Sequence, residues 1–340
     1  MSAAASAASG AGASASGSGS TPDRKAALLD ALEVLRKKEL ASKQHFKAAA
    51  YAKVRKQLSL LPAIRTIDDV RDVTGIGEKI HAKIEELLAT GVLAAAERAK
   101  AAPSFDAYDI FLHIHGVGPA KARALVDAGY TTLADLRAAA TTDPKLLNKS
   151  QRIGLQYYEA LQLRIPRAEM EQHAARLVAL AKLSTHEIHL VGSYRRGAVT
   201  SGDIDVLLRN EDPSEINAFV DALKASGYLL EVLALGDKKC MGICRLGPDS
   251  PPRRIDILRT PLSEFGYAHL YFTGPDEFNV AMRRHALTLG LSLNEHALTR
   301  TDTGAKLRIH PTERSIFDEL GLQFKEPTER AAGASAVKPV

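Results

Sequence analysis

The sequence has few cysteines and no long apolar run, and both absences narrow the classes of protein that it can encode. Only two of the 340 residues are cysteine, Cys240 and Cys244. A CxxxC pair can be half of a metal site, but no second Cys/His pair completes it, so we expect buried free thiols in a reducing compartment. No apolar stretch approaches the ~20 residues that cross a bilayer. The sequence therefore predicts a soluble protein.

Residues 1–22 lack the charge pattern of a targeting signal. They are almost wholly alanine, serine and glycine, a composition that buries too little surface to offset the entropy of ordering. No arginine precedes Arg24, as a transit peptide would require, and no charged segment precedes a leucine-rich core, as in a secretory signal. We expect this segment to be disordered and the protein not to be secreted.

The chain is modestly basic, with a formal net charge of +5. That balance favours a polyanionic partner without establishing one, because the distribution of charge matters more than its sum. At 340 residues the chain is long enough for several domains, each with a core of its own.

The most informative stretch is residues 190–208, LVGSYRRGAVTSGDIDVLL. Gly192 and Ser193 open a tight turn after an apolar run. The turn offers a hydroxyl, backbone N–H groups and the cations of Arg195 and Arg196, a combination that suits a polyphosphate.

Two carboxylates follow that turn at a spacing of two residues. Asp203 and Asp205 alternate with Ile204 and Val206, as on a strand whose apolar side chains enter the core while the carboxylates leave the other face. Neighbouring like charges are costly unless a divalent cation lies between them. Asp256 lies in a similar alternating segment. Any one of these aspartates could be an ordinary surface carboxylate, but together with the turn they predict metal-assisted phosphoryl or nucleotidyl transfer.

A glycine pattern occurs twice in the first third of the chain. Gly75-Ile-Gly77 and Gly116-Val-Gly118 each precede a helical segment. Two glycines at a helix start let backbone N–H groups approach a phosphate closely, although one copy alone could be a plain helix-capping turn. Two copies in a basic chain predict a pair of helix-hairpin-helix elements that grip a nucleic-acid backbone without reading its sequence.

These motifs together resemble the family X DNA polymerases. The resemblance rests on Gly192-Ser193, Asp203-x-Asp205, Asp256 and residues 271–274 (YFTG), and it runs from about Asp23 to Arg330. Residues 263–265, 291–298 and 326–330 are similar to a subgroup that carries an N-terminal BRCT module. We expect no such module here, because only the short Ala/Ser/Gly segment precedes the matched region.

The resemblance implies an α+β multidomain fold. Two small all-helical helix-hairpin-helix domains would precede a nucleotidyltransferase palm, with a mixed sheet and helices, and a small α+β domain of the thumb type. The predicted division is a disordered tail (1–22), a lyase-type helical domain (23–100), a second helical DNA-binding domain (101–167), the palm (168–274), a domain that binds the nascent base pair (275–332) and a frayed tail (333–340).

The resemblance also implies roles for particular residues. Two Mg²⁺ ions, or Mn²⁺, would be held by Asp203, Asp205 and Asp256. Contacts to the incoming nucleotide would come from Arg152, Ser193, Arg196, Ser201, Gly202, Tyr271, Phe272, Gly274, Asp276 and Asn279. Contacts to DNA would come from Lys47, Tyr51, Gly75, Gly77, Lys79, Gly116, Gly118, Arg254 and Arg283. Na⁺ or K⁺ would be held at the hairpins by the backbone carbonyls of Arg71, Val73 and Ile76 and of Leu112, Ile114 and Val117. On sequence alone, Arg152 could equally be a solvent-facing helix residue.

A second activity is implied for the first helical domain. Lys79 and Lys83 share one helix face at i and i+4, and neighbouring ammonium groups lower the pKa of one of them, which can make it a nucleophile. By resemblance, Lys83 aligns with the Schiff-base lysine of a 5′-deoxyribose-phosphate lyase, and Lys47, Tyr51 and Lys79 align with its 5′-phosphate pocket. The alternative that these lysines only bind phosphate stays open.

Two departures from the family pattern carry predictions. Pro275 replaces a residue that is usually serine, and because proline reduces the cost of a cis peptide to about 0.5–1 kcal/mol, we expect Gly274-Pro275 to be cis. Leu258 stands where some members carry an arginine that pairs with a metal-binding aspartate. Arg259 has the wrong register for that face, so we expect less motion between open and closed states.

The function implied is gap filling by a DNA-directed DNA polymerase with lyase activity, in base excision repair. A monomer would act on gapped or nicked duplex DNA and dNTPs, with other repair proteins, in the nucleus or another DNA-containing compartment. Template-independent or end-joining nucleotidyl transfer would need a loop in the template path, for which residues 236–239 offer little length. A non-catalytic DNA-binding protein would predict loss of a carboxylate. No 3′→5′ exonuclease signature is present in the sequence.

Overall fold

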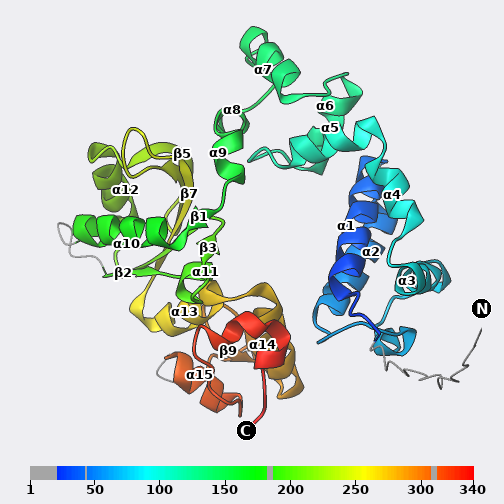
Figure 1. Ribbon diagram of the computed structural model, residues 1–340. Helices are drawn as coiled ribbons and strands as arrows, with labels where there is room; N and C mark the ends of the chain where they lie inside the picture. Colours follow the sequence, from blue (N-terminus) through cyan, green and yellow to red (C-terminus); the bar gives the residue numbers. More distant parts are fainter. Residues whose placement is uncertain (1–20, 43, 182–186, 308–311) are drawn as a thin grey trace, which may run out of the picture.

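The computed structural model describes residues 21–42, 44–181, 187–307 and 312–340. The predicted disordered segment, apart from residues 21 and 22, lies outside them. Four groups of elements follow one another along an open arc (Figure 1). The two ends of the arc approach each other, because a pocket of about 470 Å³ is lined by both Lys25 and Ala331. Among the described helices, none has the length and apolar character needed to cross a membrane.

The first group is a helical domain with its own core. It consists of α1 (Lys25–Ala41), α2 (His45–Ser59), η1 (Ile67–Val70), α3 (Glu78–Thr90) and α4 (Ala94–Lys100). One face of α1 is apolar and buried, and Leu28 and Leu32 pack with Val54 of α2 and Ile84 of α3. Packing of these amphipathic faces, rather than helix propensity alone, stabilises such short helices.

The second group is also helical. It consists of α5 (Pro103–Leu112), α6 (Pro119–Asp127), α7 (Leu133–Thr142), α8 (Lys149–Gln156) and α9 (Tyr158–Gln162). A separate core forms around Tyr108, Phe111 and Leu125. Helix α8 lies so close to the second glycine hairpin that a Cβ at Gly154 would overlap the backbone of His115.

The third group is a five-stranded mixed sheet with helices. Its elements are β1 (Ile165–Pro166), α10 (Arg167–Ala181), β2 (Glu187–Leu190), α11 (Gly192–Arg195), β3 (Thr200–Ser201), β4 (Ile204–Arg209), α12 (Glu215–Ala225), β5 (Leu229–Leu235), β6 (Lys239–Cys244) and β7 (Arg253–Thr260). The strand order is β2-β4-β7-β6-β5, and the β4–β7 pair is parallel while the others are antiparallel. The short strands β1 and β3 pair separately.

The two faces of this sheet differ in chemistry. Ile204 and Val206 of β4 and Ile257 of β7 enter a core covered by α10 and α12, which lie together against the sheet in Figure 1. The opposite face presents Asp205 and Asp256, which occupy the alternate positions of the same strands. The predicted alternation is therefore confirmed, and the fold is α+β.

The two cysteines lie on the core side of this sheet. Cys240 and Cys244 are both fully buried and unpaired, as the sequence predicted. Burial raises the pKa of Cys240 to about 11 and that of Cys244 to about 12. Neither thiol therefore has the thiolate character of a metal ligand or nucleophile at neutral pH.

The last group packs on the sheet through α13. It consists of η2 (Leu262–Glu264), α13 (Phe265–Thr273), α14 (Asp276–Thr288), β8 (Leu291–Leu293), β9 (Leu298–Arg300), α15 (Glu313–Glu319) and η3 (Glu329–Ala336). Ala268 of α13 contacts Leu207 of the sheet, whereas Leu270 and Phe278 belong to a separate core. The peptide bond Gly274-Pro275 is cis, as predicted.

The prediction that residues 333–340 form a frayed tail is wrong. The Gln323 N–H donates to the Lys338 carbonyl and the Val340 N–H donates to the Gly321 carbonyl. Ala336 is buried in the last core. The small residues of this segment have no hydrophobic periodicity, so the sequence did not indicate that it is packed. Its packing depends on backbone hydrogen bonds to residues 321–323, which the sequence pattern does not reveal.

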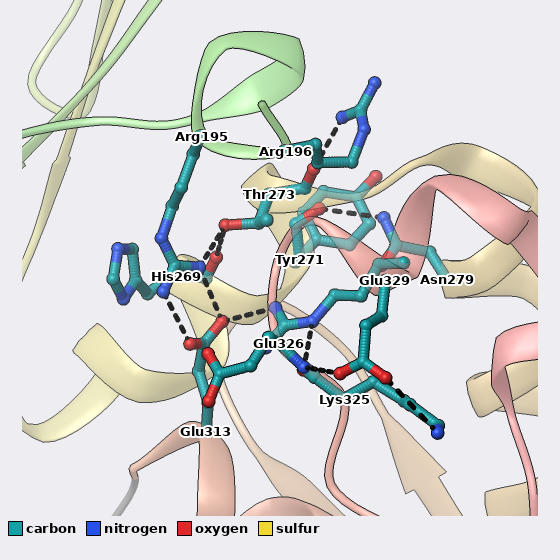
Figure 2. Close-up of polar contacts among 11 residues, drawn as sticks. Arg195, Arg196, His269, Tyr271, Thr273, Asn279, Glu313, Lys325, Glu326 and Glu329 are labelled. Atoms are coloured by element: carbon teal, nitrogen blue, oxygen red, sulfur yellow. Dashed lines mark hydrogen bonds and ion pairs between the residues drawn. The ribbon is translucent and has the colours of Figure 1, made fainter. Parts of the chain in front are cut away.

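A buried ion-pair network joins the last group to the sheet (Figure 2). Arg195 of α11 donates two hydrogen bonds to the Glu313 carboxylate, at 2.8 and 2.7 Å, and one to Thr273 Oγ1 at 2.6 Å. Arg330, whose side chain is fully buried, donates to Glu313 Oε1 at 2.6 Å and to the Lys325 carbonyl at 2.9 Å. Burial alone would raise the pKa of Glu313, but the hydrogen bonds from the two arginines outweigh it and lower that pKa to about 2.

Ala336→Asp tests the packing of the C-terminal segment. The substitution would place an unpaired charge in the last core, so we expect the free energy of unfolding to fall by more than about 2 kcal/mol. The matched control is Ser335→Asp at the adjacent exposed position, which should change it by less than about 0.5 kcal/mol. Urea unfolding measures both. Equal, small effects of the two variants would mean that the segment is not packed.

Glu313→Gln tests the network, and its effect should depend on pH. The folded pKa of Glu313 lies below its ordinary value of 4.5, so the charged form stabilises the folded state at neutral pH and this contribution is lost as pH falls from about 4.5 toward 2. We expect the variant to be about 2–3 kcal/mol less stable at pH 7 and to approach wild type at pH 3. Urea unfolding at both pH values measures this.

The control for that experiment is Glu319→Gln, which changes an exposed carboxylate on the same helix. It should be nearly neutral at both pH values. A difference between Glu313→Gln and wild type that stays constant from pH 7 to pH 3 would contradict the assignment of the stabilising charge to Glu313.

Candidate active site

A cleft of about 590 Å³ lies between the sheet and the last group. Ten of the residues that the sequence analysis assigned to nucleotide or metal binding line it: Ser193, Arg196, Gly202, Asp203, Asp205, Tyr271, Phe272, Gly274, Asp276 and Asn279. Gly192, Arg164, Pro275 and Glu277 complete the lining. The fold thus gathers residues that lie far apart in the sequence into one site.

The carboxylates beside this cleft come from the parallel strand pair. Asp205 of β4 is directly opposite Asp256 of β7 in the register. Gly192 has a φ of 60° and faces Asp205, and a Cβ at this position would overlap the Asp205 carboxylate. Only glycine satisfies both the left-handed conformation and the close approach. The turn at Gly192 and the Asp205 carboxylate are therefore complementary in shape.

The electrostatics of the carboxylate pair favour a cation. Burial and the neighbouring Asp256 charge raise the pKa of Asp205 to about 6. Asp256 is also buried, and its Oδ1 has no hydrogen-bond partner. Carboxylate oxygens that are close together and incompletely paired are the donor set that Mg²⁺ and similar hard cations prefer, so these residues fit a divalent metal.

Two basic side chains neutralise the carboxylates in this structure. Arg254 Nη2 forms an ion pair with Asp203 Oδ2, and Lys239 Nζ lies 3.1 Å from Asp256 Oδ2. In the described part of the chain, no three acidic, His or Cys side chains are already arranged around a common point. Arg254, which was assigned to DNA, thus contacts a carboxylate here.

The two arginines of the predicted phosphate-binding turn have different partners. Arg195 is held by Glu313, as described above, so only Arg196 faces the cleft. Arg196 Nη1 donates to the Thr273 carbonyl at 2.6 Å (Figure 2). Burial lowers the pKa of its guanidinium, so this cation would gain from an anionic ligand. Ser193 Oγ donates to Ser201 Oγ at 2.9 Å, and Ser201 is buried just behind the cleft.

The opposite wall of the cleft is built from α13 and α14. The Tyr271 and Phe272 rings pack edge to face with centroids 5.0 Å apart. Asn279 Nδ2 donates to the Tyr271 carbonyl at 2.8 Å (Figure 2). Arg283 lies over the Tyr271 ring, 4.7 Å from its centroid, and 3.2 Å from the Glu295 carboxylate. Asp276 and Asn279 of α14 line the cleft, whereas Arg283, which was assigned to DNA, is not among its lining residues.

Leu258 and Arg259 lie as their register predicted. Leu258 faces the cleft side of the sheet and packs against the apolar cluster of Val191, Leu207 and Ala268. Arg259 is buried on the other face, where it donates to the carbonyls of Asn210 and two other residues. It therefore cannot replace the missing arginine.

Two cleft features differ from the sequence analysis. Arg152 is exposed on α8, donates to the Pro144 carbonyl at 2.5 Å and does not line the cleft. Arg164 lines the cleft but was missed. It lies outside every recognised motif, and no spacing relates it to the aspartates. Only the pairing of β1 with β3, which are distant in the sequence, brings it there.

The predicted lyase residues lie on α2 and α3 of the first helical group. Lys83 Nζ donates to the Lys79 carbonyl at 3.1 Å. Tyr51 packs against the core that contains both helices, and burial followed by the nearby Glu39 raises its pKa. Lys47 Nζ lies 3.9 Å from the Glu39 carboxylate. Lys47 and Lys79 are both exposed, so the basic groups are accessible to an anion.

The glycine repeat forms two hairpins with the same geometry. Gly75 and Gly116 have φ values of 91° and 80°, which glycine adopts without strain. Gly77 and Gly118 are the N-caps of α3 and α6. A Cβ at either N-cap would meet nothing within 4 Å, so the N–H groups at both helix starts can be approached by a phosphate.

The carbonyl groups assigned to a monovalent cation follow the same repeat. The Val73 N–H donates to the Val70 carbonyl, and the Ile114 N–H donates to the Phe111 carbonyl at the equivalent position. A pocket of about 250 Å³ at the first hairpin is lined by Arg71, Val73 and Ile76, the residues assigned to the first cation.

Comparison with known families matches four consecutive regions. Residues 23–93 match a helix-hairpin-helix domain, residues 109–162 the fingers domain of DNA polymerase lambda, residues 164–262 the DNA polymerase beta palm and residues 268–331 the DNA polymerase beta thumb. Each match falls on one of the four structural groups described above.

Two curated relatives are both named DNA polymerase lambda. The protein from Rattus norvegicus is 32% identical over 329 residues, which cover 89% of this chain and 56% of the relative. The protein from Arabidopsis thaliana is 29% identical over 293 residues, which cover 78% of this chain and 54% of the relative. The chain spans about half the length of the curated relatives it matches. With the cleft geometry and the four consecutive matches, these findings show that the chain belongs to the family X DNA polymerases and resembles the lambda type.

Proposed function

We propose that this chain is a DNA-directed DNA polymerase that fills short gaps in duplex DNA. The observation that carries the proposal is the position of Asp205 opposite Asp256 on parallel strands, beside a cleft lined by Ser193 and Arg196. Paired carboxylates next to a phosphate-binding turn suit metal-assisted nucleotidyl transfer. The family membership supports DNA as the template and primer, in base excision repair and in the nucleus or another DNA-containing compartment.

Asp203, Asp205 and Asp256 would hold two Mg²⁺ ions, or Mn²⁺. When bound, such ions supply positive charge to the phosphates and lower the pKa of the primer 3′-hydroxyl. The cost of placing like charges side by side, seen in the raised pKa of Asp205, would be relieved by those ions. Lys239 and Arg254 would then be released from Asp256 and Asp203 for the DNA backbone.

The chain's own residues would orient the reaction. The primer 3′-oxygen joins the α-phosphorus of the dNTP, the bond from that phosphorus to the β-phosphate oxygen breaks, and pyrophosphate leaves. Asp256 Oδ1, buried and without a hydrogen-bond partner, is available to accept the proton of the 3′-hydroxyl. Ser193, Arg196 and the turn at Ser201 and Gly202 would stabilise the charge on the leaving pyrophosphate.

The aromatic wall and α14 would select the nucleotide. Tyr271 and Phe272 are bulky enough to exclude a ribose 2′-hydroxyl. Asp276, Asn279 and Arg283 would contact the nascent base pair from the minor groove, where the shared acceptors test pair geometry without specifying sequence. Arg152, which lies outside the cleft in this structure, would have to move to reach the triphosphate.

The two hairpins would hold the DNA on either side of a gap. Their open helix N-termini suit backbone phosphates, and the carbonyls of the two hairpin loops would bind Na⁺ or K⁺. The four cores support a division into domains at residues 23–100, 101–167, 168–274 and 275–332. The partners would be gapped or nicked DNA, dNTPs and other repair proteins, with the chain acting as a monomer.

The first helical group would also act as a 5′-deoxyribose-phosphate lyase. Lys83 would attack the C1′ aldehyde of the abasic sugar and form a Schiff base with loss of water. Loss of a proton from C2′ would then let the bond between C3′ and its phosphate oxygen break by β-elimination, which releases the downstream DNA strand, while the sugar keeps its own 5′-phosphate. Lys47, Tyr51 and Lys79 would bind that phosphate.

Template-independent transfer is less well supported. It would need a loop that occupies the template path. The connection between β5 and β6 is a tight turn, in which the Gly236 N–H donates to the Lys239 carbonyl at 2.9 Å. A turn closed over so few residues leaves no length for such a loop.

Asp256→Asn tests the polymerase. The change keeps the size of the buried side chain but removes its charge, so we expect insertion at a one-nucleotide gap to slow by about 10³-fold or more with DNA affinity unchanged. Asp249→Asn, an exposed carboxylate in the preceding loop, is the matched control and should insert normally. An Asp256→Asn variant that inserts the nucleotide at the wild-type rate would contradict the catalytic role of Asp256.

Lys83→Ala tests the lyase by borohydride trapping on incised abasic DNA. We expect the wild-type adduct to fall about tenfold or more in the variant, while Lys56→Ala, an exposed lysine on α2, keeps it. A wild type that fills gaps but gives no adduct would leave the first group with 5′-phosphate binding only. An undiminished adduct in Lys83→Ala would move the nucleophile elsewhere, with Lys79 the next candidate.

A further inference from the structure

The end of the chain contains a segment to which no role has been assigned above, residues 330–340, here called the η3 segment. Arg330 at its start is fully buried and donates to Glu313 Oε1 at 2.6 Å. At its other end the Val340 N–H donates to the Gly321 carbonyl at 3.0 Å. The η3 segment is therefore fixed at both ends to the last group of elements.

Between these ends the η3 segment packs on α14. Ala336 is buried in one core with Phe278, Met282 and Ala286, which follow one another at four-residue spacing along a single face of that helix. The Arg330 guanidinium lies 5.7 Å from the centroid of the Phe278 ring. The proposed base-pair contacts lie along the neighbouring face of α14, so the η3 segment supports the helix that carries them.

The η3 segment meets a residue of the cleft at Gly333. This glycine is buried and has φ 63° and ψ −135°, in the positive-φ region that favours glycine. A Cβ here would lie 3.3 Å from Glu277 Cβ and 3.4 Å from Glu277 Oε2. Because Glu277 lies in the first turn of α14 and lines the cleft, a side chain in place of Gly333 would press on that turn.

The first turn of α14 also carries groups that face the cleft. Asp276 and Glu277 belong to that turn, and Asn279 lines the cleft beside them. Asn279 Nδ2 donates to the Tyr271 carbonyl at 2.8 Å, which links the helix to the aromatic wall. A shift of this turn by a few tenths of an ångström would therefore move several groups of the site at once, and transition-state contacts depend on such small distances.

From these contacts we infer that the η3 segment is a positioning element for nucleotide selection, which acts through Gly333 on the first turn of α14. The inference rests on the proposed polymerase function. A correctly paired dNTP gains transition-state stabilisation from groups of α14 held at the right distance, whereas a mispaired dNTP engages them poorly. The position of α14 therefore affects correct insertion more than incorrect insertion. Gly333 is a positioning residue and touches no substrate itself.

Gly333→Ala tests the inference by single-turnover insertion at a one-nucleotide gap, with the matched and then a mismatched dNTP. We expect the efficiency of matched insertion to fall about tenfold, which corresponds to about 1.4 kcal/mol, and that of mismatched insertion to change by less than about twofold. The selectivity between the two should therefore fall. Affinity for gapped DNA and the lyase adduct, which depend on other groups, should stay as in wild type.

The matched control is Gly304→Ala, in the loop after β9. Gly304 has φ 70°, so alanine has a similar backbone cost there, but a Cβ would meet nothing within 4 Å. This variant should keep wild-type selectivity. A rescue variant combines Gly333→Ala with Glu277→Gly, which removes the atoms on which the new methyl group would press. It should recover part of the selectivity relative to the two single changes, as a double-mutant cycle measures.

Loss of selectivity in Gly333→Ala but not in Gly304→Ala, with coupling to Glu277, supports the inference. Unchanged selectivity overturns it, and so does an equal loss of matched and mismatched insertion, which a lowered melting temperature would assign to folding alone. If wild type inserts no nucleotide, the proposed function fails. Hydrogen exchange of residues 276–288 then still tests the positioning, because it needs no turnover. Faster exchange in Gly333→Ala than in Gly304→Ala supports it, and equal exchange overturns it.

Discussion

The parallel pairing of β4 with β7 is the constraint on which the rest of the site depends. It places Asp205 beside Asp256 with their strands' apolar neighbours turned into the core. Two carboxylates in this position repel each other, as the raised pKa of Asp205 reflects. The surrounding residues reduce this repulsion and accommodate the carboxylates. Lys239 and Arg254 offset it with opposite charge, and Gly192 leaves room for the Asp205 carboxylate to lie against the proposed phosphate-binding turn.

The adjacent residues Arg195 and Arg196 of that turn have different roles. Arg195 enters a buried network with Glu313 and Thr273, whereas Arg196 faces the cleft and reaches the Thr273 carbonyl. The same short helix therefore fixes the last group of elements on the sheet and presents a cation to a ligand. Because Thr273 contacts both arginines, a movement of the last group of elements relative to the sheet would also move the proposed phosphate-binding turn.

Much of the cleft could be predicted, because its residues lie in short motifs whose geometry is local. Alternation along a strand sets the faces of Asp203, Asp205 and Asp256, and the glycine repeat sets two helix starts. Side chains alternate between the two faces of a strand with a period of two residues, and this alternation also predicted that Arg259 points away from the carboxylates. Arg164 and the C-terminal segment could not be predicted in this way. Arg164 depends on strand pairing with residues 200–201, and Ala336 is buried by elements that lie far from it in the sequence.

The sequence by itself determined the chemical groups, their local spacing and the family to which they belong. It also determined the cis peptide at Gly274-Pro275 and the burial of both cysteines, which follow from residue type and strand periodicity. Only the tertiary structure decided which cations face the cleft. Arg195, Arg196, Arg152 and Arg164 are chemically alike, and each is directed by the partner that the fold brings within reach, respectively Glu313, Thr273, Pro144 and Thr200. Such long-range partners leave no periodic signal in the chain.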